Sequence, residues 1–170
     1  YFIQSEEFFE RPGLYGTLDH GYADNFERFV FFQKAVVRII DEWNLQPDVV
    51  HCNDWQAALV PMLLYHGIEG HFRNGQEKTL MTIHNLSHHG WAPADKFYMT
   101  NLPDSCYTMQ TLEFYGEINM LKGGLVAATA INAVSPTYAE EIKTPRFGCR
   151  LNGVLYHRQK VLHGILNGID

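Results

Sequence analysis

The 170-residue sequence has few cysteines, no excess of positive charge and no long apolar run. Its cysteines, Cys52, Cys106 and Cys149, are odd in number and form no CxxC pair, which argues against a disulfide framework or a zinc knuckle and favours a reducing compartment. The net charge of −6 provides no clustered cationic surface for nucleic acid. No apolar stretch approaches the roughly 18 residues of a membrane span, and no signal-peptide pattern follows Tyr1. We therefore expect a cytoplasmic protein that binds a small or neutral ligand, with no nucleic-acid or membrane partner.

Several catalytic motifs are also missing. The sequence contains no GxGxxG, GxxxxGK[ST], GxSxG or HExxH, so a phosphate-cradling loop, a nucleophile elbow and a zincin helix have no support. His84, His88 and His89 form an HxxxHH cluster, but a loop rich in Pro and Gly does not hold metal-ligand geometry, and no nearby Cys or paired carboxylate completes a set. The sequence therefore predicts neither a metal nor a cofactor.

The apolar pattern predicts an alternation of strands and helices. With 46% hydrophobic residues, the chain can bury one sizeable core, and we expect a single domain over residues 1–170. Tyr1–Ile3 resembles the end of a strand, and four further strands are predicted at 48–52, 79–83, 130–134 and 161–166. Between them lie predicted helices at 26–40 (N-capped by Asp24), 55–65, 113–129, 136–142 and 151–159. This order predicts an α/β fold with a Rossmann-like open parallel sheet and flanking helices.

Polar residues follow three of the predicted strands. Asp54 comes after the strand at 48–52, His84 and Asn85 after the strand at 79–83, and Asn167 after the last strand. The carboxyl ends of parallel strands share one edge, where open α/β sheets bind their ligands. Plainer interpretations remain: Asp54 caps the following helix, His84 is a buried histidine bonded to backbone, and Asn167 begins a turn.

The segment from Leu86 to Leu112 has no periodicity. Pro93, Pro103 and Gly90 are scattered among its aromatic residues. A long irregular segment within a compact domain is usually functional, so we expect a lid or an acceptor wall.

Seven ordered sequence blocks carry a resemblance to a known family. They are ERPGLYG, DNFERFVFF, PDVVHCNDWQAAL, TIHNLSHHG, EFYGEINMLKGGL, AINAVSPTYAEEI and ILNGID. In order and spacing they resemble the N-terminal half of bacterial glycogen synthases and plant starch synthases, which are retaining glucosyltransferases of the GT-B fold. The resemblance implies transfer of glucose from ADP-glucose or UDP-glucose to the non-reducing end of an α-1,4-glucan, in the cytoplasm or, in a plant or alga, in the plastid.

The resemblance also implies roles for individual residues. His84 resembles the histidine that contacts the donor glucose, and Asp54 resembles the carboxylate at the reaction centre. Fixed charges and dipoles there would stabilise an oxocarbenium-like sugar as the nucleoside diphosphate departs.

Four further residues are implied in substrate binding. Asn167 resembles the asparagine near the sugar's hydroxymethyl group, and Asn85 lies next to His84. Trp55 and Tyr15 resemble parts of a sugar-binding wall, since aromatic faces suit the apolar C–H surfaces of pyranoses.

The chain departs from the family pattern in two ways. Gln56 replaces a usual histidine, while His89 and Glu117 stand where glutamine is common, which bears on acceptor and sugar preference. The family's KxGGL loop and the diphosphate-binding residues of its second domain have no counterpart here, so we expect a partial domain with little transfer activity alone. A non-catalytic glucan-binding module, a GT-B enzyme with another donor and, more distantly, a metal-dependent hydrolase remain as alternatives.

Overall fold

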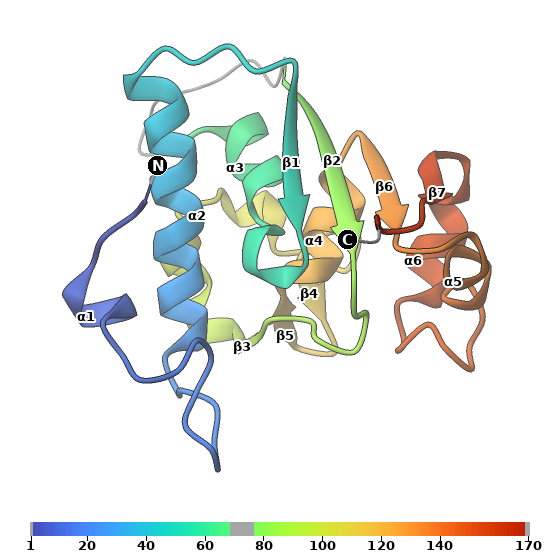
Figure 1. Cartoon of the computed structure of the whole chain (residues 1–170), viewed down its shortest axis with the longest axis horizontal. Helices are drawn as coiled ribbons and strands as arrows, with labels where there is room; N and C mark the ends of the chain where they lie inside the picture. Colours follow the sequence, from blue (N-terminus) through green and yellow to red (C-terminus); the bar gives the residue numbers. More distant parts are fainter. Residues whose placement is uncertain (1, 69–76, 169–170) are drawn as a thin grey trace.

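A four-stranded parallel sheet forms the centre of the molecule (Figure 1). The structure is a computed structural model that describes residues 2–68 and 77–168. The strands are β1 (Val49–Asn53), β2 (Lys78–Ile83), β6 (Ala130–Ala133) and β7 (Leu162–Gly164), in the order β1-β2-β6-β7. All neighbouring pairs are parallel, so every strand ends at the same edge. The predicted α/β class with an open parallel sheet is confirmed.

Helices flank the sheet. The longest is α2 (Asn25–Glu42), which packs on α3 (Val60–His66); α3 packs on α4 (Met120–Ala127), and α4 contacts α6 (Asn152–His157). In contrast, α5 (Pro136–Glu141) packs on β6 and β7, beyond the sheet from α2 (Figure 1). One hydrophobic core joins these layers, with fully buried side chains from β2, β6, α3 and α4.

Two glycines allow α4 to approach its neighbours closely. A Cβ on Gly124 would lie 2.6 Å from the carbonyl oxygen of Ala58, and one on Gly123 would lie 2.4 Å from Leu112 Cδ2. A side chain at either position would collide with its neighbour. Glycine lowers the stability of the helix itself, but it allows this close packing.

The helix predicted at 113–129 is wrong in its first seven residues. They form an antiparallel hairpin of β4 (Glu113–Phe114) and β5 (Glu117–Asn119), which pairs with β3 (Trp91–Pro93) in the order β3-β5-β4. Tyr115 and Gly116, at φ 54° and 83°, make the turn between them. The helix starts only at Met120, where the Asn119 side chain caps it by accepting a hydrogen bond from Lys122 N at 2.9 Å.

Other predicted boundaries also change. The helix predicted at 55–65 is divided into a 3₁₀ turn, η1 (Trp55–Ala57), and α3. The last strand ends at Gly164 rather than at residue 166, and Phe2 and Ile3 form no strand, while Tyr1 lies outside the described residues. The irregular segment at 86–112 contains β3 and two 3₁₀ helices, η2 (Ala94–Thr100) and η3 (Asp104–Cys106). Most of the polar connection predicted at 66–78 also lies outside the described residues.

The N-terminal segment, which includes α1 (Glu6–Phe9), is tied to α2 by side chains. Arg28 is 2% exposed, and its guanidinium donates to the carbonyl oxygens of Phe8 and Leu14 at 2.7 and 3.0 Å. As predicted, α2 begins just after Asp24, but the Asp24 side chain makes no cap. It accepts two hydrogen bonds from Arg11 instead, which lower the pKa of the Asp24 carboxyl.

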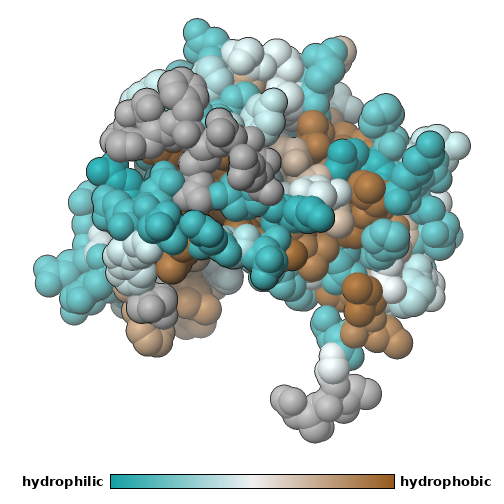
Figure 2. Space-filling model, turned by 90° about the horizontal axis from the view of Figure 1, so that it is seen from above, coloured by the Kyte–Doolittle hydropathy of each residue, from teal (hydrophilic) through white to brown (hydrophobic). Residues whose placement is uncertain are grey.

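The surface is mixed in character. Seen from above, from the starting ends of β1 and β2, mostly hydrophilic side chains are interrupted by apolar patches (Figure 2). In the part of the chain that the structure describes, no helix is both long and apolar enough to cross a bilayer.

Candidate active site

The ends of β1 and β2 bring Asp54 and His84 together, as predicted. Asn53 lies opposite Thr82 in the parallel register, so the residues that follow the two strands emerge side by side. Asp54 Oδ1 accepts a hydrogen bond from His84 N at 2.8 Å, and Asp54 Oδ2 lies 2.9 Å from His84 Nδ1. A carboxylate that accepts the Nδ1 proton orients the ring and leaves Nε2 as the nitrogen for a ligand.

The backbone at Asp54 has a conformation that favours glycine. Its φ is 54° and its ψ is −170°, which a residue with a Cβ rarely adopts. The backbone is held there because Asp54 N donates to the carbonyl oxygen of Thr82 at 2.9 Å. Conformations of this kind cost about 1–3 kcal/mol and cluster at functional sites.

The plainer interpretations of these two residues are wrong. Asp54 stands at the N-cap position of η1, but its side chain makes no capping hydrogen bond, because both carboxylate oxygens face His84. The His84 side chain is 43% exposed and its ring contacts a carboxylate rather than backbone, so it is not a buried structural histidine.

The loop after His84 is fixed by three further side chains. Asn85 Oδ1 accepts hydrogen bonds from the backbone nitrogen and the hydroxyl of Ser87, at 3.0 and 2.6 Å. Leu86 N donates to the hydroxyl oxygen of Tyr138 at 3.0 Å. His89 is buried, and its Nδ1 lies 2.9 Å from Asn119 Nδ2. Hydrogen bonds at Asn85, Leu86 and His89 therefore hold the loop from which His84 projects.

Tyr138 is a site residue that the sequence did not reveal. Burial is the main cause that raises the pKa of its hydroxyl, and the negative charge of Asp54 adds to the effect. The sequence placed Tyr138 on the helix after Ser135, correctly, but no pattern indicates that this helix faces the loop after His84. The contact depends on how α5 packs on the sheet.

Tyr15 and Trp55 belong to one aromatic row. Phe29, on α2, lies between them, with ring centroids 5.9 Å from Tyr15 and 4.7 Å from Trp55. Trp55 is half-buried and fills the space beside Gly90, where a Cβ would lie 2.6 Å from the indole ring. Tyr15, at the outer end of the row, is 49% exposed.

In the described part of the chain, Asn167 makes no contact with the pair that would place it in the same site. β7 is parallel to β6, and Ile165 N, just after β7, donates to the carbonyl oxygen of Ala133 at the end of β6 at 2.9 Å, so the chain reaches the predicted edge two residues before Asn167. It follows the strand by three residues, is exposed, and has no hydrogen bond to Asp54 or His84 among the described residues.

The histidine cluster does not gather into a metal site. His84 contacts Asp54, whereas His89 is buried against Asn119. Within residues 2–68 and 77–168, no group of three or more His, Cys, Asp or Glu side chains is placed to hold a metal ion.

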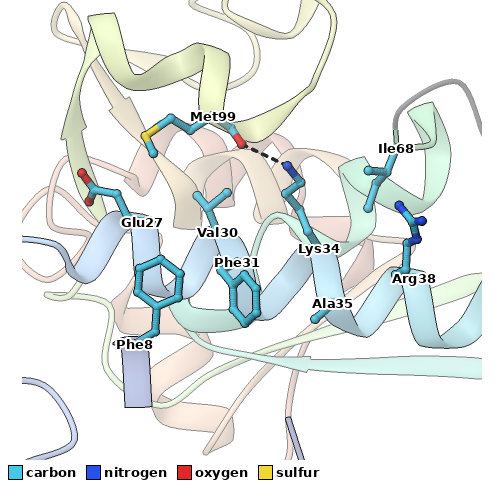
Figure 3. A pocket seen from close by; sticks show the side chains of 9 residues that line it. All are labelled: Phe8, Glu27, Val30, Phe31, Lys34, Ala35, Arg38, Ile68 and Met99. Atoms are coloured by element: carbon cyan, nitrogen blue, oxygen red, sulfur yellow. Dashed lines mark hydrogen bonds between the residues drawn. The ribbon is translucent and has the colours of Figure 1, made fainter. Parts of the chain in front are cut away.

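A separate apolar hollow lies on α2, away from this pair. It has a volume of about 420 Å³ and lies among Phe8, Phe31 and Met99 (Figure 3). Some of its polar groups are engaged, since Glu27 Oε1 pairs with Lys96 and Lys34 Nζ donates to the carbonyl oxygen of Met99. The other carboxylate oxygen, Glu27 Oε2, is buried and has no hydrogen-bond partner among the described residues.

The Asp54–His84 arrangement suits a polyhydroxyl ligand. An imidazole nitrogen can hydrogen-bond a hydroxyl, and the adjacent carboxylate can stabilise positive charge that develops on the ligand. Because both groups are fixed by backbone contacts, they need little reorganisation when a ligand binds.

The chain is similar to known proteins over most or all of its length. Residues 1–157 match the family model of the starch synthase catalytic domain. The chain is 46% identical over its whole length to the glycogen synthase of Opitutus terrae, of which it covers 35%, and 46% identical to that of Thermodesulfovibrio yellowstonii, of which it covers 34%. It thus spans about a third of the length of the curated relatives it matches.

A solved structure shows the same fold. The catalytic domain of starch synthase IV from Arabidopsis thaliana, bound to ADP and acarbose, matches 89% of this chain and 31% of its own, with a TM-score of 0.79 and 32% identity. The likeness supports the predicted GT-B type of fold. The chain therefore belongs to the starch synthase catalytic domain family.

Proposed function

We propose that this chain supplies part of the active site of a retaining glucosyltransferase. It would transfer glucose from ADP-glucose or UDP-glucose to the non-reducing end of an α-1,4-glucan. The observation that carries the proposal is the Asp54–His84 pair at the sheet edge of a chain from this family.

In this proposal each member of the pair has its own role. His84 Nε2 hydrogen-bonds a hydroxyl of the donor glucose, because Nδ1 is engaged by Asp54. The Asp54 carboxylate faces the positive charge that develops on the sugar as the nucleoside diphosphate leaves. Asp54 also holds the His84 ring, so one carboxylate both orients a ligand contact and stabilises charge.

The remaining substrate contacts follow from the surrounding side chains. Tyr15 offers an exposed ring face to a pyranose, and Trp55 supports it through Phe29. The side-chain oxygen of Asn85 accepts two hydrogen bonds from Ser87, so its amide nitrogen is the atom that would donate a hydrogen bond to a sugar hydroxyl. Asn167 would reach the hydroxymethyl end of the sugar from the segment after β7.

The relatives support the choice of ligands. The Arabidopsis structure contains ADP, which is the nucleotide of ADP-glucose, and acarbose, which is a saccharide. This chain spans about a third of its bacterial relatives, and we propose that the 170 residues transfer little glucose by themselves. The free thiols of Cys52, Cys106 and Cys149 support a reducing compartment, the cytoplasm or a plastid.

The test is transfer of radiolabelled glucose from ADP-glucose to glycogen by the full-length protein that carries this chain. Asp54→Asn and His84→Ala should each lower kcat by about a hundredfold to a thousandfold, as expected when a preorganised polar group is removed. Asp104→Asn, an exposed carboxylate on η3, is the matched control and should change little.

Three outcomes would overturn the proposal. Asp54→Asn could retain more than a tenth of the activity. The wild-type protein could bind glycogen without transferring glucose, which would indicate a glucan-binding module. A product made only with another nucleotide sugar would indicate a different GT-B enzyme.

A further inference from the structure

The hollow on α2 follows a single stripe of that helix. Phe8 of α1 borders the stripe on one side, and Met99 of η2 borders it on the other (Figure 3). The side chains that the stripe presents therefore determine what the hollow can bind. Six of the lining residues come from α2 and recur at helical spacing, namely Glu27, Val30, Phe31, Lys34, Ala35 and Arg38.

The floor of the hollow is apolar and partly exposed. Val30 is buried, whereas the Phe31 side chain is 37% exposed, with its ring centroid 5.1 Å from that of Phe8. An exposed phenylalanine in an apolar depression favours the docking of another apolar surface. A helix that lies lengthwise in such a groove makes its contacts at i, i+3, i+4 and i+7, which is the spacing of this stripe.

The two ends of the stripe carry opposite charges. Glu27 lies at the amino-terminal end and Arg38 about three turns later. Each has a partner in its own chain, since Glu27 Oε1 pairs with Lys96 and Arg38 Nε lies 2.9 Å from Glu42 Oε1. Glu27 Oε2, however, has no hydrogen-bond partner among the described residues, and the Arg38 side chain is 48% exposed. A further cation near Glu27 would offset the cost of the unpartnered oxygen.

The stripe is complementary to a copy of itself that runs in the opposite direction. Its midpoint falls between positions 32 and 33, so in an antiparallel pair of α2 helices Glu27 of one copy would lie opposite Arg38 of the second. The symmetric contact, from the second copy to the first, would form at the same time. Identical chains pair most often through such a twofold interface, in which every contact occurs twice.

The inner positions of the stripe match in the same way. Val30 would lie opposite Ala35, so that a larger apolar side chain meets a smaller one. Phe31 would lie opposite Lys34, whose aliphatic stem covers the ring while its Nζ still donates to the carbonyl oxygen of Met99. The Lys34 ammonium therefore keeps this partner when the helices meet.

The walls of the hollow are offset in this arrangement. Phe8 packs on Phe31, and Lys96 pairs with Glu27, so α1 and η2 lie mainly beside the amino-terminal half of α2. In an antiparallel pair, the walls of the second copy lie beside the carboxyl-terminal half. The walls of the two copies therefore follow one another along the helices instead of facing each other.

We propose that this stripe is a self-association surface, on which a second copy of the chain docks its own α2 in antiparallel orientation. Glu27 and Arg38 form an intermolecular ion pair at each end, with the apolar side chains between them. The contact is only one helix wide, so the pair should form weakly, with a Kd of about 10–100 μM. None of these side chains belongs to the Asp54–His84 site, so self-association does not depend on the proposed reaction.

The test is sedimentation velocity of the full-length protein that carries this chain, over about 1–300 μM. Glu27→Lys and Arg38→Glu should each weaken self-association about tenfold, because each places like charges opposite one another twice. An equimolar mixture of the two variants should associate at least as tightly as the wild type, since one variant has two positive ends and the other has two negative ends. Tm values measured alongside show whether each variant folds. Should Glu27→Lys fail to fold beside Lys96, Glu27→Gln takes its place and should weaken association about threefold.

The matched control is Glu140→Lys. Glu140 is an exposed carboxylate on α5 that pairs with Lys143 and does not line the hollow, so its reversal should leave sedimentation unchanged. The proposal is overturned by a wild-type protein that stays monomeric throughout the concentration range, or by equal losses of association in Glu140→Lys and Arg38→Glu. A mixture of the two charge-reversal variants of the stripe that associates no better than either alone would overturn it too. So would a trimer or an open series of oligomers, because a twofold pair closes on itself.

Discussion

The two sides of the candidate active site are held in place by different kinds of contact. On the sheet side, Asp54 and His84 follow adjacent parallel strands, and a backbone hydrogen bond from Asp54 N to Thr82 extends the ladder by one residue. On the N-terminal side, Tyr15 lies in a segment that is tied to α2 by side chains. Asn25 Nδ2 donates to the Tyr15 carbonyl oxygen at 2.8 Å, and Arg28 donates to that of Leu14.

This difference determines how the structure of each side responds to a substitution. The ladder is cooperative, so removing one side chain leaves the strand ends in register. The N-terminal segment depends on side chains, above all the buried Arg28 guanidinium, whose loss would remove the donor to the carbonyl oxygens of Phe8 and Leu14. The sheet side should therefore tolerate substitution structurally, whereas the N-terminal side should not.

The largest effect on stability is expected from Arg28→Met. Methionine keeps much of the apolar volume but donates no hydrogen bond to Phe8 or Leu14, so the free energy of unfolding should fall by about 3 kcal/mol. Urea unfolding measures this loss, and hydrogen exchange should show faster exchange at Tyr22, whose backbone nitrogen bonds the Tyr15 carbonyl.

The matched control is Arg38→Met, on the same helix. Arg38 forms an exposed ion pair with Glu42 at 2.9 Å, which contributes less than about 0.5 kcal/mol. Equal losses for the two variants would contradict the difference between the two sides.

A smaller effect is expected at Asp54 itself. Asp54→Gly and Asp54→Ala both remove the contact with His84, but only glycine suits a φ of 54°. The glycine variant should therefore be more stable than the alanine variant by about 1–2 kcal/mol, as measured by urea unfolding.

The same pair of substitutions at position 53 tests whether glycine is the more stable residue only at position 54. Asn53 belongs to β1, where Gly should be less stable than Ala by about 0.5–1 kcal/mol. If glycine proves less stable at position 54 as well, the ladder does not hold Asp54 in a strained conformation.

The same difference explains what the sequence could predict. Strands β1, β2 and β6 are short apolar runs bounded by polar or turn residues, so their ends, and with them Asp54 and His84, could be placed from the pattern alone. The contact between Asp54 and His84 follows from the parallel register. Hydrogen bonds from a side chain such as Arg28 to a distant segment leave no periodic pattern in the sequence, and no pattern indicates that an arginine in a helix is buried.

The hairpin at Glu113–Asn119 was missed for a related reason. Ile118, Leu121 and Leu125 have helical spacing, and this spacing concealed the turn at Tyr115–Gly116. The only signal for it is the Tyr-Gly pair, and tyrosine is not a residue that predicts such a turn. His89 and Glu117, two departures from the family pattern, line one open hollow, and no sequence argument brought them together.

The smallest effect concerns pH and acts mainly on the sheet side, through His89. Burial lowers the pKa of His89 below its ordinary value of 6.5. Above that value His89 is neutral in the folded and the unfolded chain, and its packing stabilises the fold. As the pH falls below 6.5, the unfolded chain takes up the proton first, so stability should decrease.

His89→Gln should reduce this loss of stability between pH 7 and pH 5. Part of it should remain, because burial also lowers the pKa of His66, and His66→Gln in addition should flatten the profile further. In the wild type, hydrogen exchange at Leu121 N, which bonds the His89 carbonyl oxygen, should accelerate on acidification while exchange at Tyr22 N does not. Because the two amides report on opposite sides of the site, equal acceleration at both would mean that acid loosens the whole domain rather than the loop behind His84.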